Sequence, residues 1–257
     1  MRIVVKVGTS TLMHEAGGMD IRHVEQLVKV WSDIANAGHE LVVVSSAATG
    51  LGVGKLQIER PSDMITKQAA AAVGQCELMY TYDRLFGMYN HTVAQMLLTW
   101  QDFEDSERLH NLSNTLERLL QLRVIPIINE NDSVACEEYS VGDNDTLAAL
   151  VAKCIHADMV VLLSDIEGLY TSDPHKDPEA KLIPVVAEIT EDIEALAGGA
   201  GTALGTGGMQ TKISAAKMVT EAGTDMIITN GANPIVLYDI MDGKSVGTRF
   251  MGQRHDD

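Results

Sequence analysis

Short, strongly apolar runs alternate along this chain with longer stretches in which apolar residues recur at helical spacing. The apolar runs have the length of strands, and few polar residues interrupt them. Such strands are typical of parallel sheets whose two faces are both covered by helices. We therefore predict strands at residues 3–7, 40–46, 92–98, 124–129, 159–164 and 225–231.

Helical patterns fall between these runs. The first includes Ile21 to Ile34, with Asp20 placed as its N-cap and Gly38 placed to end it. The others cover residues 62–86, 105–122, 144–155 and 211–223. This order predicts an α/β fold, a three-layer αβα sandwich around a mainly parallel central sheet. The 257 residues contain no tandem repeat or linker, so we expect a single domain over residues 1–257.

The chain is acidic, with a formal net charge of -17 at pH 7. A charge of this sign repels nucleic acid and anionic membranes, so neither is predicted as a partner. An anionic substrate would need local positive charge against this background. Lysines that lie within motifs are therefore informative.

Three isolated cysteines, Cys76, Cys136 and Cys154, suit a reducing cytosol better than a disulfide framework. The histidines form no HxxxH or Cys/His cluster, so we predict no protein-bound metal site. The start MRIVVKVG enters a strand directly, and no apolar run reaches the ~18 residues of a membrane span. We expect a cytoplasmic protein.

Four predicted strands end in polar or glycine-rich turns. Sheets of this class bind ligands beyond the carboxyl ends of their strands. The turns hold Lys6 and Gly8, then Ser45 and Ser46, then Asn129 to Asp132, and finally Ser164 and Asp165. These turns predict a ligand-binding site along the carboxyl edge of the sheet, which we call the binding edge.

Lys6 lies inside an apolar strand, where an unpaired buried ammonium group is costly. We interpret it as a positive charge directed at phosphate in the crevice. An edge-strand lysine that points to water is the alternative.

The glycine-rich run LGTGGMQTK, residues 204–212, ends in a second lysine. It is not a P-loop, because Thr211 rather than glycine precedes Lys212 and Ile213 follows it. Its glycines let the backbone approach a ligand, and the following helix offers free N–H groups to an anion. Lys212 in the first turn opposes the helix dipole, which a bound anion would explain. A flexible loop with a surface lysine is the alternative.

Two acidic motifs complete the pattern. In VGDND, residues 141–145, one of Asp143, Asn144 and Asp145 is an N-cap, and a carboxylate could hold two lysines by charge-assisted bonds. INEND, residues 128–132, directly follows a buried strand. For both motifs an ordinary cap or polar turn is the alternative.

Together, and in this order, these motifs resemble the amino acid kinase family, and within it the members that phosphorylate glutamate. The resemblance spans nearly the whole chain and includes VVKVGTS, VSSAATGLG, KQAAAAVGQ, INEND, VGDNDTLAALVA, LLSDIEGLYTSDP and GTGGMQTKISAAKMVTEAG. It implies transfer of the γ-phosphoryl group of ATP to the side-chain carboxylate of L-glutamate, a first step of proline biosynthesis. The runner-up is a kinase of the same fold that acts on aspartate, N-acetylglutamate, carbamate or UMP. A non-catalytic amino acid sensor is the alternative from another class.

The resemblance also implies roles for single residues. Lys6, Lys212 and Asp145 would be catalytic, and Ser46, Asp132 and Asn144 would bind glutamate. Backbone N–H groups of Gly8 and of the Ser46–Ala47 turn would face phosphate and acceptor. Mg²⁺ would be held by the nucleotide phosphates, with no metal site of the protein itself. ATP would be bound, mainly in the part from about 160 to 257, by Lys6, Ser164, Asp165, Thr206, Gly207, Gly208, Met209, Gln210, Thr211 and Lys212.

Further expectations rest on the family alone. They are a homo-oligomer and feedback inhibition by L-proline through the loop near residues 133–142. The C-terminal PUA domain of many bacterial relatives is expected to be absent, because the chain ends at GTRFMGQRHDD. Many relatives have glycine where this chain has Ala47, and alanine keeps the N–H but loses easy access to positive φ.

Overall fold

The computed structural model describes residues 1–257 except 15, 136–140, 175, 198–207 and 254–257. Within the described residues, a central sheet of eight strands runs in the order β3-β4-β2-β1-β5-β7-β8-β6. Every pairing is parallel except the one between β7 and β8. The strands are β1 (Arg2–Val7), β2 (Glu40–Ser45), β3 (Val93–Leu98), β4 (Ile125–Glu130), β5 (Met159–Ser164), β6 (Val185–Val186), β7 (Asp225–Asn230) and β8 (Thr248–Phe250).

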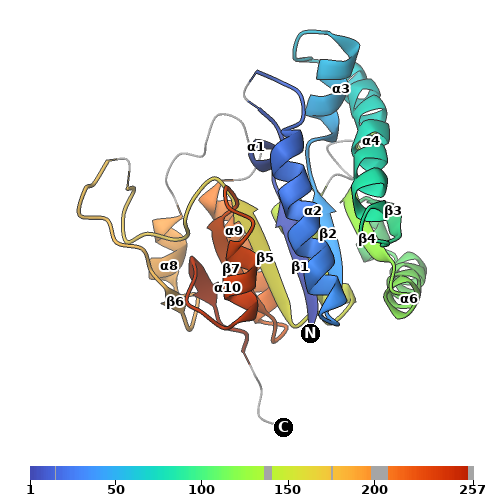
Figure 1. The fold of residues 1–257 in the computed structure, drawn as a ribbon. Helices are drawn as coiled ribbons and strands as arrows, with labels where there is room; N and C mark the ends of the chain where they lie inside the picture. Colours follow the sequence, from blue (N-terminus) through green and yellow to red (C-terminus); the bar gives the residue numbers. More distant parts are fainter. Residues whose placement is uncertain (15, 136–140, 175, 198–207, 254–257) are drawn as a thin grey trace.

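Helices cover both faces of this sheet (Figure 1). One buried cluster joins α6 (Ser106–Gln121), α7 (Asn144–Cys154) and α9 (Met209–Thr220) to one face. The other joins α2 (Ile21–Asn36) and α4 (Met64–Gly87) to the opposite face. The shorter helices are α1 (Thr9–Leu12), α3 (Ala48–Leu56), α5 (Gln101–Glu104), α8 (Glu191–Leu196) and α10 (Val236–Met241).

Strand periodicity decides which side chains meet which layer. In β1, Ile3, Val5 and Val7 pack toward α2 and α4, whereas Val4 packs toward α6, α7 and α9. Lys6 shares the side of Val4, because alternate residues of a strand point to the same face. The strand therefore directs the Lys6 side chain toward α7 and α9.

The three-layer α/β architecture predicted from the sequence is confirmed, and every predicted strand and helix lies within a few residues of its expected place. The helix caps have simple causes. The Asp20 side chain accepts the His23 N–H at the start of α2, and Asp143 accepts the Thr146 N–H at the start of α7. Among the described residues, no helix combines the length and apolar character needed to cross a membrane.

Helix α3 was not predicted: residues 48–56, which follow the predicted turn at Ser45 and Ser46, are helical. Helix α9 begins at Met209, two residues before its predicted start at Thr211. Glycine weakens an isolated helix, so the sequence of α3 predicts no helix by propensity. Packing against α4 provides the stability that the local helix propensity of α3 lacks.

Helices α3 and α4 touch through their backbones. A Cβ atom at Gly52 would lie 1.8 Å from the carbonyl oxygen of Ala70, and one at Gly74 would lie 1.7 Å from that of Ala48. Only glycine permits this approach. Because Ala48 follows the end of β2, the crossing fixes the position of the turn at the binding edge.

Gly74→Ala is expected to lower the free energy of unfolding by about 2 kcal/mol or more, because the methyl group would push α3 away from α4. Urea unfolding measures the change. Gly87→Ala is the matched control in the same helix, since a Cβ there meets nothing within 4 Å. The control should be as stable as the wild type or more so. A Gly74→Ala protein that matched its control would contradict the close crossing.

Candidate active site

The predicted site residues gather at the carboxyl edge of the sheet. Lys6 lies near the end of β1, and Ser46 directly follows β2. Asp132 follows β4, Ser164 ends β5, and Asn144 and Asp145 begin α7. The parallel pairing of β1 with both β2 and β5 brings these strand ends side by side. Residues far apart in the sequence thus share one edge.

Asp145 holds both lysines by ion pairs. Its Oδ1 lies 2.7 Å from Nζ of Lys6, and its Oδ2 lies 3.0 Å from Nζ of Lys212. The Asp145 side chain is 1% exposed, and those of Lys6 and Lys212 are 11% and 6% exposed. Thr211, expected only as an ATP contact, also donates its hydroxyl to Oδ2 of Asp145 at 3.0 Å. The arrangement joins β1, α7 and α9 at one carboxylate.

The electrostatics of this cluster are asymmetric. Burial by itself would raise the pKa of Asp145, but the neighbouring ammonium groups of Lys6 and Lys212 lower it below its ordinary value. Asp145 is therefore ionised at neutral pH. Two ammonium groups face one carboxylate, so these three groups carry a net positive charge in a chain of net charge -17. Such a site attracts a multiply charged anion.

Ser46 and Asn144 are in direct contact. The Nδ2 group of Asn144 donates to Oγ of Ser46 at 2.7 Å and to Oδ1 of Asn129 at 3.1 Å. Asn129 in turn donates through Nδ2 to Oε1 of Gln75 at 3.0 Å. Asn129, in INEND, was placed at the binding edge but given no role, and Gln75, in KQAAAAVGQ, was missed as a site residue. No periodicity or spacing in the sequence indicates that these two motifs touch.

Asp132 lies beside a second carboxylate. Burial, and then the charge of Glu130, raise the pKa of Asp132 to about 6. Glu130 is 8% exposed and accepts the N–H of Val141 at 2.6 Å. Within the described part of the chain, Asp132 makes no hydrogen bond to Ser46 or Asn144. It lies at the same sheet edge but outside their network.

Ala47 adopts the left-handed conformation. Its φ is 82° and its ψ is -4°, and it forms the N-cap of α3. A residue with a Cβ pays about 1 kcal/mol for this conformation, which glycine would avoid. The turn between β2 and α3 is therefore locally strained.

The residues expected to bind ATP are only partly described. Thr206 and Gly207 lie outside the described residues. Gly208 is the N-cap of α9, and Met209 to Lys212 form its first turn. Ser164 donates its hydroxyl to the Asp165 carboxylate at 3.0 Å at the end of β5. Gln210 lines a cavity of about 460 Å³ between α8 and α9.

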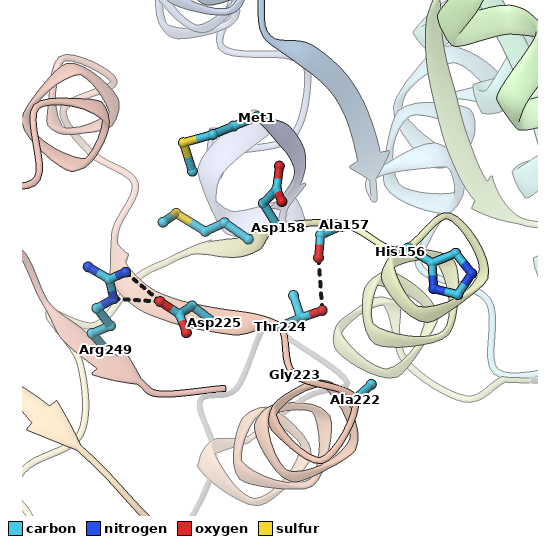
Figure 2. A pocket seen from close by; sticks show the side chains of 10 residues that line it. Met1, His156, Ala157, Asp158, Ala222, Gly223, Thr224, Asp225 and Arg249 are labelled. Carbon is cyan, nitrogen blue, oxygen red and sulfur yellow. Dashed lines mark hydrogen bonds and ion pairs between the residues drawn. The ribbon is translucent and has the colours of Figure 1, made fainter. Parts of the chain in front are cut away.

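A second cavity of about 440 Å³ lies at the opposite, amino edge of the sheet, where β5 and β7 begin (Figure 2). Several of its polar groups are used within the fold. Arg249 donates through Nε to Asp225 at 3.0 Å, and Thr224 donates to the carbonyl of Ala157 at 2.8 Å. Asp158 accepts the backbone N–H of Arg2 at 2.6 Å. This cavity contains none of the predicted site residues.

Comparison with known proteins agrees with the geometry of the carboxyl edge. The profile of the amino acid kinase family matches residues 1–230. The chain belongs to the amino acid kinase family. A glutamate 5-kinase from Clostridium tetani is 54% identical over 249 residues, which cover 96% of this chain and 93% of the relative. A glutamate 5-kinase from Clostridium perfringens is 50% identical, over 98% of this chain and 96% of the relative.

Solved structures of other kinases share the fold. Carbamate kinase from Giardia lamblia, bound to AMP-PNP, superposes with a TM-score of 0.71 at 20% identity, over 98% of both chains. An isopentenyl phosphate kinase superposes with a TM-score of 0.67 at 19% identity, over 98% of this chain and 100% of the other. At this level of identity the likeness extends to the fold alone. Proteins of different names thus share one architecture.

Asp145→Asn is expected to lower the free energy of unfolding by about 3 kcal/mol at pH 7, because it leaves two buried ammonium groups without their counter-charge. The pKa of Asp145 is lowered in the folded state, so its contribution is complete above the unfolded pKa of about 3.9. The contribution is lost as the pH falls through the folded pKa. Urea unfolding from pH 7 down to pH 3 measures the difference.

Asp143→Asn is the matched control at the N-cap of the same helix, since asparagine caps as well as aspartate. It should differ little from the wild type at any of these pH values. If Asp145→Asn were equally harmless, the ion pairs would contribute nothing to folding.

Proposed function

We propose that this protein uses ATP to phosphorylate the side-chain carboxylate of L-glutamate, forming L-glutamyl 5-phosphate. The observation that carries the proposal is the pair of buried lysines held by Asp145 at the carboxyl edge of the sheet. The identity of the acceptor is inferred from the relatives named glutamate 5-kinase, which are 54% and 50% identical to this chain over nearly its whole length. The reaction would open proline biosynthesis, as the relatives' name implies.

The chemistry suits this arrangement. The acceptor carboxylate has an ordinary pKa of about 4.3 and is ionised at neutral pH, so no general base is needed. The main barrier is the approach of an anion to a polyanion. Lys6 and Lys212 would reduce it by stabilising charge on the transferring phosphoryl group from two sides. Asp145 would hold the two ammonium groups close together despite their mutual repulsion.

The acceptor would be recognised by polar groups at the ends of β2 and β4. Ser46 and Asn144 form one hydrogen-bonded pair there, and Asp132 offers a carboxylate. A carboxylate paired with the α-ammonium group would select an amino acid over a simple dicarboxylate. The backbone N–H groups of Gly8 and of the Ser46–Ala47 turn would serve as further donors.

The nucleotide would lie over α9 and the end of β5, in the part from about 160 to 257. In the described part of the chain no side chain caps α9, so its first N–H groups fit phosphate oxygens. The cavity beside Gln210 lies in the same part. Asp145 is paired with Lys6 and Lys212. Among the described residues, no three or more His, Cys, Asp or Glu side chains form a group that could hold a metal ion. Mg²⁺ would be held by the phosphates of ATP, where it neutralises charge.

The test is ADP release with ATP, Mg²⁺ and L-glutamate, with the acyl phosphate trapped as a hydroxamate. Aspartate, N-acetylglutamate, carbamate and UMP form the comparison panel. We expect L-glutamate to have the highest kcat/KM. A higher value for another member of the panel would overturn the acceptor assignment, and amino acid binding without ADP release would indicate a sensor. Inhibition by L-proline and homo-oligomer formation stay predictions, which the same preparation can test.

Lys212→Met is expected to lower kcat by about 100-fold or more, because it removes one of the two ammonium groups that would stabilise negative charge on the transferring phosphoryl group. Lys244→Met is the matched control, because that exposed ammonium group also pairs with a carboxylate, that of Asp239, and lines neither cavity. The control should keep nearly full turnover. Equal kcat values for the two variants would rule out the role of Lys212.

Asp132→Asn is expected to raise the KM for L-glutamate about tenfold or more at pH 7, with a smaller effect on the KM for ATP. In the wild type, the KM for glutamate should also rise as the pH falls through about 6, the pKa of Asp132. In the variant this dependence should disappear. Initial rates between pH 5 and 8 measure both effects.

The same substitution should make the protein more stable at pH 7. The pKa of Asp132 is raised in the folded state, so its contribution to stability is complete below about pH 3.9 and lost as the pH rises through about 6. Asparagine avoids that loss. A variant that was less stable at pH 7 and unchanged in the KM for glutamate would contradict the assignment.

A further inference from the structure

Three amide side chains form a chain of hydrogen bonds beneath the proposed acceptor site. Gln75 lies on α4 directly after Gly74, Asn129 lies in β4, and Asn144 begins α7. Oε1 of Gln75 accepts from Nδ2 of Asn129 at 3.0 Å, and Oδ1 of Asn129 accepts from Nδ2 of Asn144 at 3.1 Å. Asn129 is 3% exposed and Gln75 is 7% exposed, so both amides are cut off from bulk water.

Backbone groups set the direction of this chain. The N–H of Glu130 can only donate, and it donates to Oδ1 of Asn129 at 2.9 Å. The other end of the Asn129 amide, Nδ2, must therefore face Gln75, which has to present its oxygen. At the end nearest the acceptor site, Oγ of Ser46 accepts a hydrogen bond from Nδ2 of Asn144 at 2.7 Å. Asn144 thus points its NH₂ group toward the oxygen of Asn129, and Asn129 points its own toward the oxygen of Gln75.

The direction has a consequence at each end. At the buried end, Nε2 of Gln75 has no hydrogen-bond partner among the described residues, although the atom is buried. Such a donor costs stability. At the site end, Oδ1 of Asn144 has no partner among the described residues and remains an acceptor. An ionised glutamate carries one donor group, its α-ammonium.

We propose that Gln75 is a positioning residue for the acceptor site. Its Oε1 holds the amide of Asn129 and, through it, that of Asn144, so that Oδ1 of Asn144 is presented to the α-ammonium group of the amino acid. The buried, unpaired Nε2 is the cost of placing a neutral acceptor at this position. This inference rests on the proposed function and extends it to a residue that does not touch the substrate.

The test compares L-glutamate with glutarate, which has the same two carboxylates and lacks the ammonium group. Gln75→Met keeps the shape of the side chain and removes the acceptor. It should weaken L-glutamate binding about tenfold and glutarate binding by much less, because only the ammonium group uses Oδ1 of Asn144. Calorimetric Kd values for both ligands measure this, and the KM for ATP should not change.

Gln75→Glu is the second variant, and it keeps an oxygen facing Asn129. Its added negative charge should weaken the binding of both anions. The preference for L-glutamate over glutarate should still be at least that of the wild type. Thr81→Val is the matched control at a buried polar position of the same helix. It should leave the preference unchanged, whatever it does to the Tm.

The outcomes separate the two proposals. If wild-type protein with ATP failed to phosphorylate L-glutamate, the proposed function would fail. If the wild type were active but Gln75→Met reduced the affinity for both ligands equally, or for neither, the role of Gln75 would be overturned. A loss of preference in Gln75→Glu would overturn it as well, and this result is decisive even if Gln75→Met does not fold.

Discussion

The carboxylate of Asp145 is the contact on which the arrangement of this molecule depends. It joins a strand at the start of the chain to a helix near its end, with Nζ distances of 2.7 Å to Lys6 and 3.0 Å to Lys212. Either lysine buried alone would be costly, and the two together would repel each other. One shared counter-ion stabilises both and leaves an excess of positive charge. An acidic chain thereby gains a local site for a phosphorylated ligand.

Features that are unfavourable by themselves collect at the same sheet edge. Ala47 has a left-handed backbone, the pKa of Asp132 is raised to about 6, and Nε2 of Gln75 is buried without a partner among the described residues. Elsewhere the strands are mostly apolar, and helices α2, α4, α6 and α7 are capped by aspartates, as local rules require. Strain and unpaired groups that cluster in one place are typical of binding sites, where the surrounding fold holds them in position. The close α3–α4 crossing at Gly52 and Gly74 is part of that support.

Much of the architecture could be predicted because it depends on local patterns. Buried parallel strands are almost continuously apolar, and helices such as α2 combine a 3.6-residue period with an aspartate cap. Helix α3 could not be predicted in this way, because its glycines disfavour a helix until α4 is packed against it. The antiparallel return of β8 onto β7 also depends on distant pairing. Local propensity carries no information about either contact.

The sequence by itself determined which chemical groups stand at the ends of the strands: two lysines, the acidic motifs and the glycine-rich run before α9. Only the tertiary structure decided which of them meet. Lys212 and Asp145 are 67 residues apart in sequence, and Asn129 and Gln75 are 54 apart, yet each pair shares a hydrogen bond. The left-handed φ of Ala47 and the direction of the amide chain are likewise consequences of packing. The physical reason is that periodicity reports which face of an element is buried, whereas a contact between two elements depends on how their faces are brought together.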